Sequence, residues 1–443
     1  MTAPLPAGLP GIPAVLDALR PGRSRITAPA LMRIAALNPS LGAFLTVSKG
    51  PARAANDARR RAGRTLGPFD GVPVVLKDNI DMVGFVTIAQ SRQTPDRPTG
   101  RDTDLVARLR QAGAVIIGRT ALHEFVRGGS GDDLPWPDAR NPWNAVRTCG
   151  GSGSGSAVAG MVSLAAGSVT GRSVRYPAEC RNLAGPKPTC GCIGRRGIFP
   201  PSFSLDAAGP IARAALDADP ALSVLPGHDP GGPGALEHAG PDPLASLEDG
   251  GQLLGIHYAH GYGAASGASA EQAATAVPPE PDRMDAATWT ILLAGALAAH
   301  RPTLPAQARD YCCLTRKRLS AGTFVTGEKR VQAMCLRRLN AKSTAGSIDT
   351  DAAVVRPAAV GVPVSVAVLD RCPCRRAHAL TAPSNLTGQP ALAVPEGVSA
   401  KGLPLQLAGR AGGEATPLRI ARAHERITGW HDARPDLTDL EPT

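Results

Sequence analysis

Short apolar runs that alternate with amphipathic segments constrain the fold of this chain more than any other feature of its sequence. The run Pro73–Leu76 (PVVL) is too short for a helix and suits a buried strand. The segment Thr103–Ala112 has helical spacing and leads directly into a second apolar run at Val115, Ile116 and Ile117. Strands that alternate with helices favour a mixed β-sheet with helices on both faces, so we predict an α/β fold.

Two further segments have helical patterns near the two ends of the chain. Thr27 can cap a helix in which Pro29 occupies the first turn, and we expect Asn38 and Pro39 to end it. A second helix is predicted over Ala415–Arg426.

The low aromatic content limits how the core can be built. Aromatic residues make up 3% of the 443 residues, whereas hydrophobic residues make up 43%. The 50 glycines and 42 prolines approach the level at which disorder competes with folding, but the apolar content argues against a disordered chain. We therefore expect a core of Ala, Val, Leu and Ile, and modest stability, because alanine buries little apolar surface.

No apolar stretch reaches the roughly 18 residues that a membrane-spanning helix needs. The longest candidates, Ile291–Ala299 and Ala157–Ala166, are shorter than that. The N-terminal sequence MTAPLPAGLPGIPAVLDALR lacks a basic stretch followed by a compact apolar run, so secretion is not indicated. We expect a cytoplasmic protein that does not interact with membranes.

The net charge of +11 raises the question of nucleic-acid binding. The basic residues are scattered, and the densest cluster, Arg59, Arg60, Arg61 and Arg64, contains no aromatic residue. Short basic runs of this kind are usually solvated helix faces, so we do not expect nucleic acid as a partner.

Nine cysteines include two C-x-C pairs, Cys190 with Cys192 and Cys372 with Cys374. Zinc sites usually space their ligands as C-x2-4-C, and no histidine pair at suitable spacing accompanies these cysteines. A disulfide framework is also unexpected in a cytoplasmic protein. The sequence therefore predicts no metal site.

The run GGSGSGS at Gly150–Ser156 is the strongest candidate for a functional loop. Such a run is typical of a flexible linker, of a phosphate-binding loop, or of a turn that carries a nucleophilic serine. A P-loop is excluded because no Gly-Lys-Ser/Thr follows. A linker is disfavoured because the run leads straight into an apolar helical segment.

A serine nucleophile needs a base, and none of the nine histidines lies in a recognisable triad motif. Lysine can serve as the base if burial lowers its pKa enough to leave the amine neutral. Lys77 is the candidate, because it directly follows the apolar run at Pro73–Leu76. The alternative is an ordinary lysine at the end of a strand.

Several motifs, taken in order along the chain, resemble those of the amidase signature family. They are GPFDGVPVVLKDNID (67–81), RTCGGSGSGS (147–156), GRSVRYPA (171–178), GPKPT (185–189), SLDAAGPIAR (204–213), APSNLTGQPA (382–391), VPEG (394–397) and GLPLQLAG (402–409). The order matches across residues 25–430. The resemblance implies the α/β amidase-signature fold, with a mixed central sheet flanked by helices on both faces.

The resemblance also implies a single amidase-like domain over residues 1–443. Within it we expect a catalytic signature half at residues 25–215, a variable Gly- and Pro-rich excursion at residues 216–285, and a C-terminal half at residues 286–430 that completes the sheet and the pocket. The segments expected to build the pocket are residues 220–281 and residues 311–339.

The family implies a Ser-Ser-Lys triad. Ser173 would be the nucleophile, Ser152 would bridge it to the base, and Lys77 would be the general base. The oxyanion hole would be formed by the backbone N–H groups of Thr170, Gly171, Arg172 and Ser173. The implied reaction passes through an acyl-enzyme, with a small-molecule amide as substrate and no metal or organic cofactor.

The chain departs from the family pattern at three positions in the site. Gly153, Val169 and Arg172 stand where the family usually has serine, aspartate and glycine. Arg172 would either obstruct the substrate and adopt backbone angles that favour glycine, or help to keep Lys77 neutral by charge repulsion. The segment from Ser152 to Ser173 is also about three residues shorter than usual, nearly one helical turn. The two serines can still meet if a loop absorbs this difference, but not if a helix does.

Three functions follow from these observations. The first is an amidase that hydrolyses a small carboxamide. The second is the amidase-like A-subunit of a tRNA-dependent amidotransferase, which passes on ammonia released from glutamine. The third is a degenerate, inactive amidase fold. The oligomeric state is left open, and a homodimer is one of the options.

Overall fold

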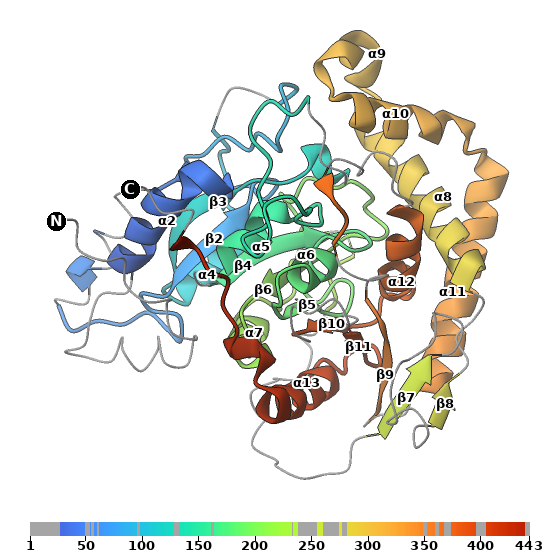
Figure 1. The fold of residues 1–443 in the computed structure, drawn as a ribbon. Coiled ribbons are helices and arrows are strands. Elements are labelled where there is room, and N and C mark those ends of the chain that lie inside the picture. Colours follow the sequence, from blue (N-terminus) through green and yellow to red (C-terminus); the bar gives the residue numbers. More distant parts are fainter. Residues whose placement is uncertain are drawn as a thin grey trace.

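The architecture comes from a computed structural model of the chain (Figure 1). The structure describes residues 27–48, 54, 57–59, 62–94, 98–127, 133–160, 164–232, 234–237, 255–259, 274–276, 281–348, 352–358, 363–366, 374–395 and 405–438. The N-terminal sequence considered above, Arg60 and Arg61 of the basic cluster, and Cys372 lie outside these residues.

The first part of the sheet carries the predicted strands. Its five strands have the order β1-β3-β2-β4-β6, and their bounds are β1 (Phe44–Val47), β2 (Pro73–Lys77), β3 (Val115–Thr120), β4 (Leu164–Val169) and β6 (Ala207–Ile211). β2 runs parallel to both β3 and β4, whereas β1 and β6 pair antiparallel at the two edges. Every residue of β2, β3 and β4 is buried, as expected for central strands that are covered on both faces.

The second part of the sheet comes mainly from the C-terminal half. Its six strands have the order β5-β10-β11-β9-β7-β8, with bounds β5 (Gly185–Lys187), β7 (Gly255–Ala259), β8 (Ala274–Ala276), β9 (Ala352–Pro357), β10 (Ala391–Val394) and β11 (Leu405–Ala408). Ala184 and Ala212 form a bridge directly beside β5 and β6, with N–H to carbonyl distances of 2.9 and 3.0 Å. This bridge joins the two parts into one mixed sheet.

The helices have these bounds: α2 (Thr27–Leu41), α4 (Asp104–Gln111), α5 (Ser154–Gly160), α6 (Arg175–Glu179), α7 (Ala215–Val224), α8 (Pro281–His300), α9 (Leu304–Gln307), α10 (Cys313–Ala321), α11 (Gly327–Ser347), α12 (Cys374–Thr387) and α13 (Ala415–Thr428). In Figure 1, α8, α11 and α12 stand together beside one end of the sheet, and these three helices contact one another. None of the described helices combines the length and the apolar character that crossing a bilayer requires.

Alternating side chains of β10 show that helices cover both faces of the sheet. Leu392 and Val394 belong to a cluster that includes Leu418 of α13. Ala393, between them, belongs to the cluster that includes Ala178 of α6. Because successive side chains of a strand point to opposite faces, α13 and α6 lie on opposite sides. The predicted α/β fold with a mixed sheet between helices is confirmed.

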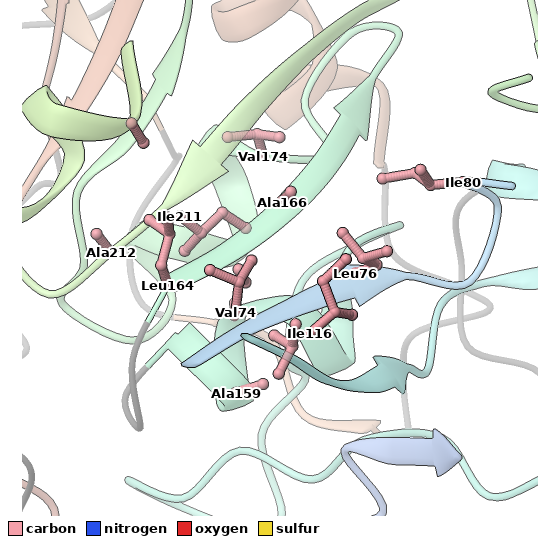
Figure 2. Packing of buried hydrophobic residues seen from close by; sticks show 14 of the residues in the cluster. Val74, Leu76, Ile80, Ile116, Ala159, Leu164, Ala166, Val174, Ile211 and Ala212 are labelled. Atoms are coloured by element: carbon pink, nitrogen blue, oxygen red, sulfur yellow. The ribbon is translucent and has the colours of Figure 1, made fainter. Parts of the chain in front are cut away.

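The core around the central strands is built from small and aliphatic side chains (Figure 2). Val74 and Leu76 of β2 lie among Ile116, Leu164 and Ile211 from the neighbouring strands. This is the composition expected from the low aromatic content. Lys77, the last residue of β2, therefore lies directly next to the apolar core.

The predicted helices at 103–112 and 415–426 form as α4 and α13. Thr103 caps α4, because its Oγ1 accepts a hydrogen bond from the Val106 N–H at 3.1 Å. The prediction that Asn38 and Pro39 end the first helix is wrong, since α2 continues to Leu41. The Asn38 carbonyl still accepts a bond from the Gly42 N–H at 2.8 Å, which sustains one more turn.

The expected excursion at residues 216–285 differs from the structure where the structure describes it. α7 occupies the start of this stretch, and its Ala218, Ala221 and Leu222 are buried. β7 and β8 belong to the sheet, and β7 pairs with β9. Apolar residues at helical spacing outweigh Pro220, which lies inside α7. Residues 281–285 already belong to α8, and residues 233, 238–254, 260–273 and 277–280 lie outside the described residues.

Candidate active site

Lys77, Ser152 and Ser173 form a continuous hydrogen-bonded chain. Lys77 Nζ lies 2.9 Å from Ser152 Oγ, and Ser152 Oγ lies 2.9 Å from Ser173 Oγ. Lys77 and Ser152 are 0% exposed, and Ser173 is 5% exposed. The structure thus brings together the three side chains that the sequence singled out.

The sheet positions these residues because β2 and β4 are parallel neighbours. Lys77 ends β2, Ser173 follows β4 in the loop before α6, and Ser152 lies in the bend before α5. Since the carboxyl ends of parallel strands meet at one edge of a sheet, Lys77 reaches the loop that carries Ser173.

Ser168 and Asn79 hold the lysine from its other side, and sequence reasoning missed both. Ser168 accepts hydrogen bonds from Lys77 Nζ through its carbonyl oxygen and its Oγ, each at 3.1 Å. Asn79 Nδ2 donates to the same Oγ at 2.9 Å. The parallel pairing of β2 with β4, which no local pattern encodes, brings these groups together.

Burial sets the charge of Lys77. Removal from water lowers its pKa to about 7, and the negative charge of Asp206 opposes this shift. A large fraction of the amine is therefore neutral near pH 7. Arg172 is not among the causes of the shift, so the structure does not support the alternative in which that arginine keeps Lys77 neutral.

Asp206 anchors the start of the loop that leads to Ser173. Thr170 Oγ1 donates to Asp206 Oδ1 at 2.6 Å, and the Ser202 N–H donates to Asp206 Oδ2 at 3.1 Å. Burial raises the pKa of Asp206 to about 7. No hydrogen bond from the backbone N–H groups of Gly171, Arg172 and Ser173 to another described residue is found, and these three residues line the cavity described below.

A family model described as Amidase matches residues 25–257. The chain belongs to the amidase family. The glutamyl-tRNA(Gln) amidotransferase A-subunit of Roseiflexus sp. (strain RS-1) is 34% identical to it, over 92% of this chain and 93% of that protein. Further relatives with the same name, at 31 to 33% identity, include that of Symbiobacterium thermophilum.

Solved structures of the amidase family have the same fold. One, described as a vestigial protein complex that reveals the evolutionary origins of an s-triazine catabolic enzyme, is 27% identical with a TM-score of 0.88, covering 95% of this chain and 99% of that one. Native peptide amidase from Stenotrophomonas maltophilia is 26% identical with a TM-score of 0.80, covering 98% of this chain and 99% of that one.

Gly153, a departure from the amidase pattern, has a steric reason. A Cβ at this position would lie 2.5 Å from the backbone oxygen of Ser173, closer than real Cβ atoms approach. The backbone of Ser173 therefore occupies the space that a serine side chain at position 153 would need. The shortened connection between Ser152 and Ser173 is tolerated, because the two hydroxyls still meet.

Arg172 does not distort the loop as expected. It is not one of the five non-glycine residues with positive φ in the described chain, so the prediction that it adopts glycine-like angles is wrong. Its guanidinium lies over the ring of Tyr176, with Cζ 5.1 Å from the ring centroid. Val169, the third departure, is fully buried in the apolar cluster of the sheet.

A cavity of about 50 Å³ opens beside Ser173. One wall is the loop Thr170–Ser173, and the other comes from Arg127 and from helices α8, α10 and α12. The side chains of this second wall are Arg127, Trp289, Leu292, Arg318 and His378. Arg318 falls in the predicted pocket segment 311–339, whereas none of the described lining residues falls in the other predicted segment, 220–281.

His378 presents one polar atom to the loop that precedes the nucleophile. Its Nδ1 lies 2.9 Å from Asp285 Oδ1, so Nδ1 carries the proton and Nε2 is an acceptor. Burial lowers the pKa of His378, although Asp285 opposes the shift, and the ring is neutral near pH 7. A Cβ at Gly171 would lie 2.5 Å from Nε2, which explains why glycine is needed at this position.

The described residues contain no group of three or more His, Cys, Asp or Glu side chains that could hold a metal ion.

Proposed function

We propose that this chain hydrolyses a carboxamide bond, with Ser173 as the nucleophile, Ser152 as a proton relay and Lys77 as the general base. The observation that carries the proposal is the buried chain from Lys77 Nζ through Ser152 Oγ to Ser173 Oγ, with both distances at 2.9 Å. A lysine with a pKa of about 7 can accept a proton at neutral pH.

The hydrogen-bond inventory of neutral Lys77 supports this role. Its two N–H groups are satisfied by the carbonyl oxygen and the Oγ of Ser168, which leaves its lone pair for the Ser152 hydroxyl. In the structure Lys77 Nζ donates to Ser152 Oγ, and Ser152 Oγ donates to Ser173 Oγ. For the relay both hydroxyls turn, so that Ser152 donates to the neutral amine and accepts the proton of Ser173 without a change in the distances between the heavy atoms.

In the first half of the reaction, Ser173 Oγ attacks the amide carbonyl while its proton passes through Ser152 to Lys77. The tetrahedral intermediate carries a negative charge on the former carbonyl oxygen, and the open backbone N–H groups of Gly171, Arg172 and Ser173 would stabilise it. Thr170 N–H is the fourth expected donor. The intermediate collapses, ammonia or an amine leaves with the proton returned by Lys77, and an ester to Ser173 remains.

In the second half, water attacks the ester, again with Lys77 as base through Ser152. The Ser173 hydroxyl is restored and a carboxylic acid is released. No group outside the chain and the substrate takes part in the proton transfers.

The test is active-site labelling together with ammonia release. We expect a fluorophosphonate to label the purified wild-type protein at Ser173, as located by mass spectrometry, and Ser173→Ala to abolish both labelling and amide hydrolysis. Ser320→Ala, at an exposed position on α10, is the matched control and should behave like wild type. An unlabelled wild-type protein that hydrolyses no amide would instead favour the degenerate, inactive fold.

The curated relatives favour a second function, that of the A-subunit of a glutamyl-tRNA(Gln) amidotransferase. The same triad would then release ammonia from glutamine for transfer within a complex. Glutaminase activity that depends on partner subunits and on aminoacylated tRNA would support this function. Ammonia release by the isolated chain, unchanged by such additions, would support a free-standing amidase.

A further inference from the structure

The cavity beside Ser173 has an unbalanced positive charge. Arg127, Arg172 and Arg318 line it, and no aspartate or glutamate does so among the residues that the structure describes. The nearest acidic groups are engaged behind the lining, Asp206 by Thr170 and Asp285 by His378. The cavity therefore has the charge of a site for an anion.

Among the three arginines that line the cavity, Arg127 has buried N–H groups without a hydrogen-bond acceptor among the described residues. It is 5% exposed, and its Nε and Nη2 are buried without a hydrogen-bond partner in the described part of the chain. Burial and the charge of Arg318 lower its pKa to about 9, and the negative charge of Asp206 opposes this shift, so Arg127 stays cationic at pH 7. Buried guanidinium N–H groups without a hydrogen-bond acceptor are rare in proteins unless a ligand supplies one.

Arg127 lines the cavity, and its two nitrogens without a described partner lie beneath the accessible surface. Nε and Nη2 form one edge of the planar guanidinium, and two parallel N–H bonds from such an edge match the two oxygens of a carboxylate. Arg318 supports this arrangement, since its Nη1 donates to the backbone oxygen of Arg127. Arg172 adds a second, partly exposed charge next to Ser173.

We propose that Arg127 binds a carboxylate of the substrate, and that the substrate is the monoamide of a short dicarboxylic acid, with its carboxamide placed at Ser173. The proposal rests on the amide hydrolysis proposed above. The cavity of about 50 Å³ opens beside Ser173 and is small, so the spacer between the two groups must be short.

The same charges disfavour glutamine and asparagine. Both carry an ammonium beside the carboxylate, and this cation would lie among three guanidinium groups without an acidic partner. His378 offers one uncharged acceptor, which does not neutralise an ammonium. Succinamate and glutaramate have the carboxamide and the carboxylate but lack the ammonium, so they fit the cavity better.

The experiment measures ammonia release by the full chain from succinamate, glutaramate, glutamine and butyramide. We expect kcat/KM for the two monoamides to exceed that for glutamine and butyramide by at least about 10-fold. Arg127→Gln should lower kcat/KM for the monoamides about 10- to 100-fold, and that for butyramide by less than about 2-fold. Arg316→Gln, on α10 but outside the cavity lining, is the matched control and should leave every value unchanged.

Two further measurements separate failure of this proposal from failure of the hydrolytic function. Fluorophosphonate labelling needs Ser173 but no carboxylate, so Arg127→Gln should be labelled like wild type if it is folded. Calorimetric binding of succinate to Ser173→Ala needs the carboxylate site but no chemistry, and Arg127→Gln in that background should abolish it.

The outcomes are distinct. Labelling at Ser173 with equal kcat/KM for butyramide and succinamate would overturn the carboxylate site and leave the hydrolytic function standing. Arg127-dependent binding of succinate without hydrolysis of any amide would keep the site and remove the function. A preference for glutamine that survives Arg127→Gln would overturn the proposal in favour of the amidotransferase function.

Discussion

The two walls of the cavity are built in different ways. One wall is the loop Thr170–Ser173, and Lys77 and Ser152 lie buried behind it in the hydrogen-bonded chain that reaches Ser173. We call this side, which carries the proposed triad, the catalytic wall. The opposite wall takes Trp289, Arg318 and His378 from α8, α10 and α12, and α8 contacts both other helices. Under the proposed function, the catalytic wall would determine the reaction and the opposite wall the substrate.

Buried polar side chains hold the two walls in register. Arg175 of α6 donates from Nη2 to the Gly171 carbonyl at 2.9 Å and from Nη1 to Gln406 Oε1 at 3.0 Å. Asn385 of α12 donates to the carbonyl oxygens of Val169 and Leu205, at 3.2 and 2.9 Å. Because these bonds join β4 and its loop to α12 and β11, the position of the second wall is set relative to the nucleophile.

The largest effect is expected on the catalytic wall, from Lys77→Ala. Loss of the proposed base, which contacts Ser152, should lower kcat/KM for amide hydrolysis by about 10⁴-fold or more, as for other members of a catalytic triad. Steady-state ammonia release measures the effect, with Lys329→Ala at an exposed position as the control. Activity within tenfold of wild type would mean that the base is another group, and that this wall does not determine the reaction.

Gly153→Ser tests how tightly the catalytic wall is built. The added Cβ would lie 2.5 Å from the Ser173 oxygen and must displace the nucleophile or its neighbours. Displacements of about 1 Å can cost 10²-fold in rate, so we expect fluorophosphonate labelling to slow by about 10- to 100-fold. Gly100→Ser is the control, because nothing lies within 4 Å of the Cβ added there. An unchanged labelling rate would show that the loop relaxes without consequence for the triad.

The catalytic wall could be predicted from the sequence because each of its residues lies in a short contiguous motif. Lys77 directly follows an apolar run, Ser152 lies in the glycine and serine run at 150–156, and Ser173 lies in the motif at 171–178. Asn79 lies in the motif at 67–81 and Ser168 outside every motif; neither was predicted, because their contacts depend on which strands pair. Strands β2 and β3 and helices α2, α4 and α13 were predictable for a similar reason, since burial periodicity is local.

The individual residues of the second wall could not be predicted from the sequence. No local pattern marks Arg127, Arg318 or His378, which are separated by up to 251 positions and meet only because helices α8, α10 and α12 converge. Part of the sheet was also missed. β7 and β8 lie in a Gly- and Pro-rich stretch; β8 pairs with β7, and the pairing of β7 with β9 is long-range.

A pH profile sharpens the electrostatic account of the catalytic wall. Lys77 must be neutral to act as a base, and its pKa is about 7, so kcat/KM should be constant well above pH 7 and fall about tenfold per unit below it. Asp206 also titrates near pH 7, so the observed midpoint belongs to the interacting pair. In Asp206→Asn the charge that raises the pKa of Lys77 is lost, and the midpoint should move to lower pH. A shift to higher pH would contradict this account.

The smallest effect is expected on the second wall, from Asp285→Asn. Asp285 accepts a hydrogen bond from His378 Nδ1, and this contact keeps Nε2 available as an acceptor beside Gly171. An asparagine can turn its amide N–H toward Nδ1, which moves the proton to Nε2 and converts the acceptor into a donor. Loss of one hydrogen bond to the substrate predicts a rise in KM of about 2- to 10-fold.

Because the triad does not touch Asp285, the labelling rate of Ser173 should be the same in Asp285→Asn as in wild type. Asp282→Asn, one turn earlier on α8 and exposed, is the control for the loss of a charge on this helix. A fall in labelling together with the rise in KM would show that the two walls are coupled through Gly171. An effect confined to KM would indicate that the second wall acts on the substrate alone. In that case the position of Ser173 would be unaffected by the altered proton on His378, the residue that faces Gly171.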